Sequence, residues 1–321
     1  MIFRVVFLPV FFLQISSVSL IAQDYPTKPI SVIVPFAAGG TLDVFVRFIG
    51  NNISTKLKQS FIVNNKPGGA TVIGVAAGAK APPDGYTLTA IANGFTVNAT
   101  LVRPLPYNST EDFSPVAKLV STPHVFVVRS TLPVNSFAEL LDYAKKNPSK
   151  LTYAHFGVGT NSHISMERLK FMAKVDFTAV PYKGQAPATS DLLGGHVDMM
   201  AANLPDILPL VESSQLKALG ALSPARLKEF PSVPTFEEIG FTGFTSETWF
   251  GLLAPAQTPP TIIGKLYTAI SELLAEGSIA AQIRARGMEP SVLGPIDFKN
   301  FLNEEIKRNA KIIHDIKLPA P

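Results

Sequence analysis

The 321-residue chain contains no cysteine. This absence excludes disulfide bonds and metal sites built on thiolates. The chain also has a single tryptophan, and no long basic run accompanies its formal net charge of +4. A modest positive charge without a basic cluster argues against nucleic-acid binding and supports only a mild attraction for anionic solutes.

The chain also lacks the spacing patterns of common metal and catalytic sites. Its five histidines have no ligand spacing to one another, and neither an H-E-x-x-H helix nor a G-x-S-x-G turn occurs. Its glycine turns lack the Gly-Lys-Ser/Thr ending of a phosphate loop and the third glycine of a dinucleotide fingerprint. We therefore expect no cofactor, no metal site and no catalytic residue.

The first 22 residues have the pattern of an export signal. Arg4 precedes an apolar stretch at residues 5–21, and Ala22 offers a small residue for cleavage before Gln23. This pattern predicts a secretory signal peptide cleaved near Ala22, with an uncleaved anchor as the alternative. No cysteine follows the apolar run, which excludes a lipoprotein anchor. We expect the mature protein to be soluble and exported.

Residues 29–49 organise the rest of the chain. A β-branched run at 30–34 is typical of a buried parallel strand, and a small-residue turn with Gly39 and Gly40 follows it. Thr41 is a plausible N-cap for a helix whose apolar face includes Phe45 and Ile49. Free N–H groups and the positive dipole end at such a helix start attract an anion, so we interpret this turn as half of a carboxylate site. A tight turn that binds nothing is the alternative.

The same order of strand, glycine turn and helix recurs in the second half of the chain. Residues 151–156 have the pattern of a strand, 157–163 form a glycine loop, and 164–172 have the pattern of a helix; another glycine loop lies at 66–71. The alternation of strands and helices predicts an α/β fold, and a glycine turn in each half suits a ligand held between two domains. We predict a first lobe from 23–122 plus 247–321 and a second lobe from 123–246, with crossovers near 121–125, 223–245 and 247–252.

Six motifs then match a known family in order. They are Pro35-Phe36 with Gly39-Gly40, Asp43 and Arg47, and the segments KPGGA at 66–70, PPDGYTL at 82–88, VPYKG at 180–184, DLLGGHVD at 191–198 and FPSVPT at 230–235. On these motifs the chain resembles the Bug family, the substrate-binding proteins of tripartite tricarboxylate transporters. The resemblance implies a periplasmic, two-lobe (type II, Venus flytrap) α/β protein that delivers a small carboxylate to a membrane permease. The ligand would be a di- or tricarboxylate, an amino acid or an aromatic carboxylate.

The resemblance also implies which residues grip the ligand. In the first lobe they are Ala38, Gly39, Gly40, Thr41, Asp43, Ala70 and Thr71. In the second lobe they are Gly159, Thr160, Asn161, Ser162 and His163, with Asn203, Asp206 and Lys183 as further candidates. This chain departs from the family pattern at Ala37-Ala38 and at His155-Phe156, so the ligand of a relative cannot be transferred to it.

Several roles stay open at the level of sequence. Asp43 either caps its helix or holds a water or an ammonium group, and His163 either supports the helix start or contacts the ligand. A periplasmic hydrolase acting on a small carboxylate or ester is the alternative function. It would need Ser162 or Thr160 as nucleophile and His163 as base, although adjacent residues at a helix start rarely face each other.

Overall fold

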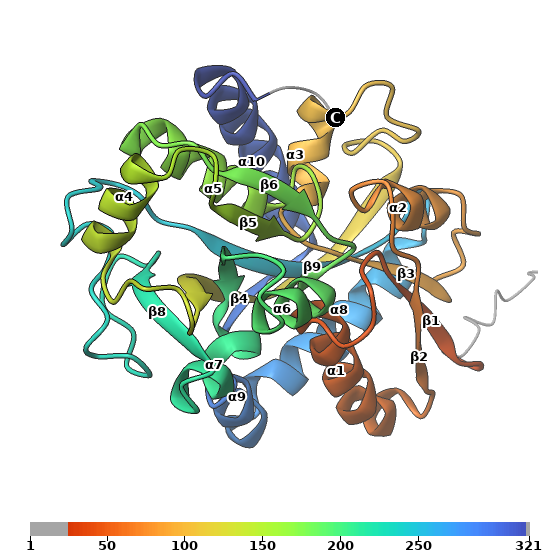
Figure 1. Ribbon diagram of the computed structural model, residues 1–321. Coiled ribbons are helices and arrows are strands. Elements are labelled where there is room, and N and C mark those ends of the chain that lie inside the picture. Colours follow the sequence, from red (N-terminus) through yellow and green to blue (C-terminus); the bar gives the residue numbers. More distant parts are fainter. Residues whose placement is uncertain (1–24, 319–321) are drawn as a thin grey trace, which may run out of the picture.

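The computed structural model describes residues 25–318, so the predicted signal peptide and its cleavage point lie outside the described residues. The chain is an α/β protein (Figure 1). The strands are β1 (Ile30–Val34), β2 (Phe61–Asn65), β3 (Thr87–Ile91), β4 (Phe113–Arg129), β5 (Thr152–His155), β6 (Thr178–Pro181), β7 (Met199–Asn203), β8 (Leu216–Ala221), β9 (Glu247–Pro255) and β10 (Glu289–Leu293). The helices are α1 (Thr41–Leu57), α2 (Val72–Ala79), α3 (Gly94–Leu101), α4 (Phe137–Lys146), α5 (Asn161–Ala173), α6 (Gln185–Leu193), α7 (Leu204–Glu212), α8 (Pro260–Ala275), α9 (Gly277–Arg284) and α10 (Pro295–Asp315).

One long strand, β4, connects the two halves of the molecule. Its first part pairs with β9 as far as Pro123, opposite Glu247, and also with β10. From His124 onward it pairs with β7 and β8 instead. On one side of this exchange lie β9, β3, β1 and β2, and on the other lie β7, β5 and β6. The parallel strands β1, β2 and β3 therefore belong to one lobe and β5, β6 and β7 to the other.

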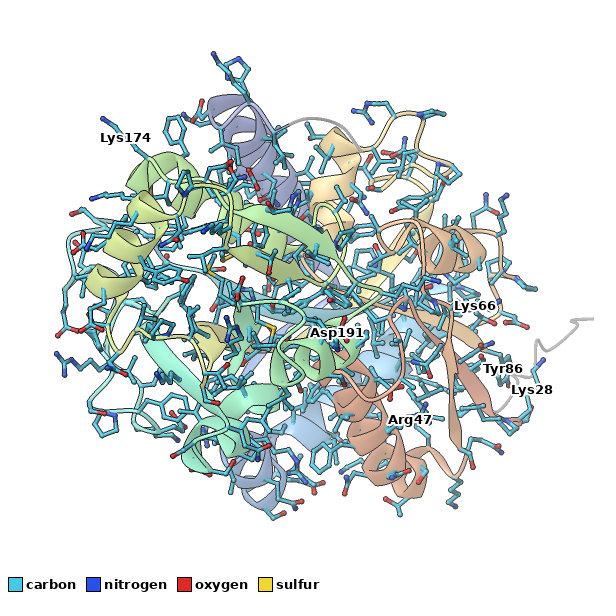
Figure 2. All side chains as sticks on the ribbon, in the orientation of Figure 1. Lys28, Arg47, Lys66, Tyr86, Lys174 and Asp191 are labelled. Carbon is cyan, nitrogen blue, oxygen red and sulfur yellow. The ribbon has the colours of Figure 1, made fainter. Side chains whose placement is uncertain are left out.

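Each lobe has its own apolar core. In the first lobe, Ile30, Val32 and Phe45 pack with side chains of α8 and α9. In the second lobe, the buried faces of β4, β5 and β7 pack against α4 and α5 on one side and α6 and α7 on the other. Lys28 and Lys174 are exposed and lie at opposite edges of the molecule (Figure 2).

Two expectations about local structure were wrong. The cluster Asn203-Leu204-Pro205-Asp206 has the pattern of a loop, but α7 begins at Leu204, because Pro205 lies in the first turn of the helix, where no backbone N–H is needed. The sequence reading also missed α3, since most of its residues are buried and no apolar stripe marks it.

The predicted crossover at 223–245 packs largely within the second lobe. Phe236 and Phe244 are buried in its core, and Ala221 bridges to Thr235. The position of Trp249 at the predicted crossover near 247–252 favours packing between the domains, but its ring lies against Phe298 and Phe301 of α10. Among residues 25–318, no helix is long and apolar enough to cross a membrane.

Candidate functional site

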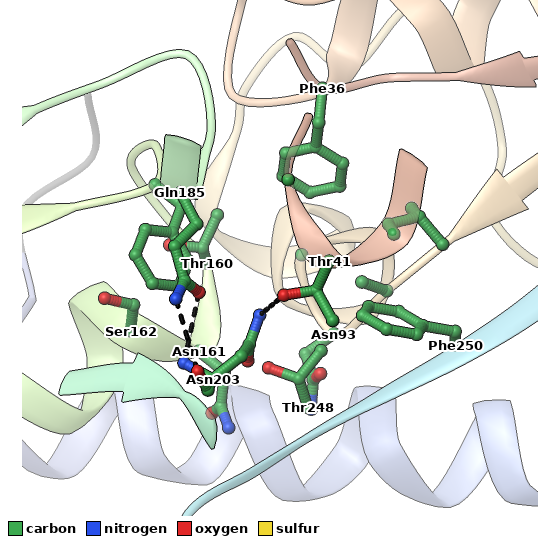
Figure 3. A pocket seen from close by; sticks show the side chains of 15 residues that line it. Phe36, Thr41, Asn93, Thr160, Asn161, Ser162, Gln185, Asn203, Thr248 and Phe250 are labelled. Atoms are coloured by element: carbon green, nitrogen blue, oxygen red, sulfur yellow. Dashed lines mark hydrogen bonds between the residues drawn. The ribbon is translucent and has the colours of Figure 1, made fainter. Parts of the chain in front are cut away.

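The N-terminal ends of five helices meet at one small cavity between the lobes (Figure 3). This inner cavity has a volume of about 40 Å³. Each helix contributes its first residues or its N-cap: Gly40, Thr41 and Leu42 for α1, Asn93 and Gly94 for α3, Thr160, Asn161 and Ser162 for α5, Gln185 for α6, and Asn203 for α7. Since one buried water needs roughly 10–15 Å³, the inner cavity has room for a carboxylate group but not for a whole solute.

The electrostatics of the inner cavity favour an anion without any formal charge. The first N–H groups of a helix have no partner within the helix, and the helix dipole places partial positive charge at the same end. No lysine, arginine, aspartate or glutamate occurs among the described residues that line the cavity. An anion would therefore be held by backbone amides and neutral side chains, as at other helix N-termini.

Most polar side chains of the inner cavity are already engaged by the protein. Gln185 donates from Nε2 to the carbonyl of Asn203 and accepts its N–H at Oε1. The Thr160 hydroxyl donates to the carbonyl of Gly157 at 2.8 Å. Ser162 is the exception: its Oγ is buried and has no hydrogen-bond partner among the described residues. A buried hydroxyl without a partner costs free energy, and we expect a ligand atom to supply that partner.

A larger outer cavity adjoins the inner one. It has a volume of about 550 Å³ and is lined by the 68–72 loop of the first lobe and by Gly157 and Tyr182 of the second. Phe36 and Phe156 line both cavities and so mark the boundary between them. Lys183 is the one charged side chain among its described lining residues. A solute could thus place its carboxylate in the inner cavity and its body in the outer one.

Asp43 and His163 hold equivalent positions behind the two glycine turns. Asp43 Oδ2 accepts the N–H of Gly39 at 2.9 Å, and His163 Nδ1 accepts the N–H of Gly159 at 3.2 Å, each four residues along the chain. Arg47 and Asn65 also bind the Asp43 carboxylate. Burial opposes its ionisation, but these hydrogen bonds lower the pKa of Asp43 overall. Each side chain thus accepts a hydrogen bond from the backbone of its glycine turn and stabilises that turn, which favours the capping role for Asp43.

His163 is held neutral by its surroundings. Its ring stacks on that of His155 with centroids 4.3 Å apart, and both rings are buried. Burial lowers the pKa of His163 to about 3, helped by the nearby His155 and Lys170. Since His163 Nδ1 accepts from Gly159 and the Ser162 hydroxyl has no partner, these two residues do not form a nucleophile–base pair.

A chain of hydrogen bonds links the two lobes through the exchange point of β4. Asn203 Nδ2 donates to Thr41 Oγ1 at 3.1 Å, and Asn203 Oδ1 lies 3.0 Å from His124 Nε2. His124 Nδ1 lies 2.9 Å from Ser246 Oγ, which also accepts from Asn161 at the start of α5. Burial lowers the pKa of His124 to about 4, so this ring is also neutral near pH 7. The network ties the first turns of α1 and α5 to the crossover strands.

The structure divides the predicted site residues into three groups. Gly40, Thr41, Thr160, Asn161, Ser162 and Asn203 line the inner cavity, and Ala70 and Thr71 line the outer one with Lys183. The remaining predicted residues line neither: Ala38, Gly39, Asp43, Gly159, His163 and Asp206.

Several lining residues were missed from the sequence. Gln185 begins α6 after the strand β6 and the turn residue Gly184. This is the same order of strand, glycine turn and helix that predicted the other two turns, so the sequence did contain a signal for Gln185. Asn93 and Gly94 had none, because α3 itself was not predicted. Thr248 and Phe250 come from the returning strand β9 and reach the site only through the fold.

Comparisons with known proteins agree with this architecture. The model of the tripartite tricarboxylate transporter family receptor matches residues 45–318. Protein BugT of Bordetella pertussis is 34% identical over 296 residues, which cover 92% of this chain and 91% of BugT.

Two solved structures were determined with carboxylates. An R. palustris protein solved with adipate has 34% identity and a TM-score of 0.89, covering 92% of this chain and 99% of its own. MatC from Rhodopseudomonas palustris, solved with bound malate, has 30% identity and a TM-score of 0.85, covering 90% and 100%. The chain is also similar to the periplasmic binding protein BugD. Together these matches show that it has the two-lobe fold of periplasmic binding proteins and that it is a solute-binding protein rather than an enzyme.

Proposed function

The chain belongs to the tripartite tricarboxylate transporter receptor family, and we propose that it captures a small carboxylate between its lobes and delivers it to a membrane permease. The convergence of five helix N-termini on a cavity of carboxylate size carries this proposal. The apolar stretch at 5–21 and the small residue Ala22 support export to the periplasm after signal cleavage. The periplasmic location of BugD, similar in sequence and fold, supports the same compartment.

We propose a dicarboxylate or an aromatic carboxylate as the preferred ligand. The outer cavity is apolar on most of its wall and large enough for an aliphatic chain or a ring. Lys183 offers a cation for a second carboxylate at the far end. An amino acid fits less well, because no acidic side chain among the described lining residues of either cavity would hold its ammonium group.

A ligand panel with matched neutral controls tests the proposal. We expect adipate, malate, citrate or benzoate to raise the melting temperature and to bind in titration calorimetry, whereas adipamide and sugars do not. Gly40→Val is the site control: Gly40 has φ −81°, and an added Cβ has no neighbour closer than 3.9 Å, so the variant should fold. Its side chain would occupy the approach to the α1 amides and reduce affinity by about a hundredfold or more. Binding of sugars alone, or unaltered binding by Gly40→Val, would contradict the proposal.

The lobe boundaries at 122/123 and 246/247 remain our proposal for the hinge. The first lies one residue before the point where β4 exchanges partners, and the second is where β9 begins. A ligand that touches both lobes favours their closed arrangement by its differential affinity. Small-angle scattering should show a smaller radius of gyration once a ligand from the panel saturates the protein; an unchanged radius would place the ligand on one lobe only.

A further inference from the structure

A third cavity lies on the other side of the first turn of α5. This hinge cavity has a volume of about 410 Å³ and is lined by residues of α5, α10 and the crossover segments, among them Arg168, Arg308, Ser223, Thr245 and Glu247. It is distinct from the inner and outer cavities, and it shares with the inner cavity only Asn161. Two guanidinium groups thus reach it from helices that belong to different parts of the chain.

Arg168 has no anionic partner within the described chain. It is half-buried on α5, and its guanidinium carbon lies 5.2 Å from the ring centre of Phe244. No carboxylate among residues 25–318 lies within 4.0 Å of it. Burial lowers the pKa of Arg168, and the positive charge of Arg308 lowers it further. A partly desolvated guanidinium without a counter-charge is costly, and an anion in the cavity would relieve that cost.

Arg308 approaches the same cavity from α10 and is only partly neutralised. Its Nη2 lies 2.7 Å from Glu305 Oε1, and its side chain remains largely exposed. The planar guanidinium has five N–H donors, so one carboxylate contact leaves others available. Glu247 lines the hinge cavity and adds a second carboxylate besides Glu305, which already pairs with Arg308, so within the described chain Arg168 is the arginine without an ion pair.

We propose that the hinge cavity is a second anion site, which binds a small oxyanion of the phosphate or sulfate class between Arg168 and Arg308. The guanidinium fork matches the oxygen spacing of such anions and binds them through paired, charge-assisted hydrogen bonds. A cavity of about 410 Å³ accommodates a hydrated tetrahedral anion. The site differs in chemistry from the inner cavity, which has no charged side chain among its described lining residues.

The position of the hinge cavity couples it to the solute site. Asn161 lines both cavities, and its Nδ2 donates to Ser246 Oγ at 2.9 Å and to the Glu247 carbonyl at 2.6 Å. An oxyanion held by α5 and α10 together stabilises the arrangement in which these helices lie side by side. By linkage, it raises the affinity for a solute that needs the same arrangement, and the solute raises the affinity for the oxyanion.

The test uses inorganic phosphate as probe, against chloride at equal ionic strength. We expect phosphate to raise the melting temperature of the mature wild-type protein. Arg168→Gln and Arg308→Gln should each weaken the apparent affinity for phosphate at least tenfold. Lys174→Gln removes one positive charge from the exposed end of the same helix, away from the cavity, and should behave like the wild type (Figure 2).

One further variant, Gly40→Val, separates the hinge cavity from the solute site. Gly40→Val blocks the inner cavity, so a phosphate effect that survives it cannot come from the solute site. If Arg168→Gln does not fold, the exposed Arg308 still provides a variant that should. The proposal would be overturned if the wild type and Arg308→Gln responded equally to phosphate. It would also be overturned if Gly40→Val abolished the response and the arginine variants did not. Neither result bears on carboxylate binding at the inner cavity, which the ligand panel tests separately.

Discussion

The Thr41 hydroxyl donates a hydrogen bond of 2.6 Å to the Asp206 carboxylate across the two lobes. Thr41 begins α1 in the first lobe, and Asp206 lies in the first turn of α7 in the second. The Thr41 N–H also points to the same oxygen, at 3.3 Å. Asp206 thus joins the lobes beside the inner cavity without lining it. Burial raises the pKa of Asp206 to about 6, although these two hydrogen bonds from Thr41 lower it.

The contribution of Asp206 to stability should depend on pH in a defined direction. Its folded pKa of about 6 lies above the ordinary value of 3.8, so between these values the folded state binds more protons than the unfolded state. The contribution of Asp206 is therefore largest below about pH 4 and is lost as pH rises to about 6, by up to roughly 3 kcal/mol.

The measurement is the difference in unfolding free energy between wild type and Asp206→Asn, followed by urea denaturation from pH 4.5 to 7.5. This difference should fall as pH rises. The same comparison with Asp142→Asn, on the exposed face of α4, should stay flat. A flat profile for Asp206→Asn as well would show that this carboxyl titrates normally in the folded protein.

His163 should make the protein sensitive to acid. Its folded pKa of about 3 lies below the ordinary 6.5, so the unfolded state binds more protons between these values, and the stability that His163 contributes above pH 6.5 is lost as pH falls. Asn at this position can offer an oxygen to the Gly159 N–H without a titratable ring. We expect His163→Asn to lose less stability than the wild type between pH 7 and 5, whereas His314→Asn, at a 90% exposed side chain, follows the wild type. Identical slopes for all three proteins would refute the assignment.

The hydroxyl group of Ser162 should contribute more to ligand affinity than the hydroxyl group of Thr160. The buried Ser162 Oγ lacks a partner, while Thr160 already donates to Gly157. Ser162→Ala should weaken carboxylate binding about ten- to a hundredfold, the worth of a hydrogen bond to a charged group, with little effect on folding. Calorimetry against the ligand from the panel measures this, with Ser271→Ala on α8 as the control. Unchanged affinity in Ser162→Ala would mean that the ligand is held by backbone amides alone.

Two glycine-to-alanine substitutions should have opposite effects on stability. A Cβ at Gly251 in β9 would lie 2.3 Å from Phe298 Cζ and 3.0 Å from the Ala117 carbonyl, so Gly251→Ala should destabilise by about 1–3 kcal/mol. Gly264 lies inside α8 with nothing within 4 Å of an added Cβ. Gly264→Ala should stabilise by up to about 1 kcal/mol, because alanine is the better helix former. Thermal and urea unfolding of both variants check the pair, and equal effects would contradict the packing around β9.

The local units of this protein could be predicted from consecutive residues. The β-branched run before Gly39 and the apolar periodicity after Thr41 are properties of consecutive residues, and they were enough to predict β1, α1 and the turn between them. The same held for β5 and α5. The family motifs, spread in order along the chain, were enough to predict the two-lobe fold and the class of solute-binding protein, which the comparisons confirm.

Which residues meet at the site could not be predicted in the same way, because it depends on how distant segments fold together. Asp43 and His163 adjoin the predicted turns in sequence, yet each faces the back of its turn, because the direction of a side chain depends on what packs against it. Gln185, Asn93 and Thr248 come from distant segments and converge because β4 and β9 set the two lobes face to face. The spacing of apolar residues along the chain indicates whether a residue is buried. It does not indicate which distant residue packs against it, because that contact depends on the fold as a whole.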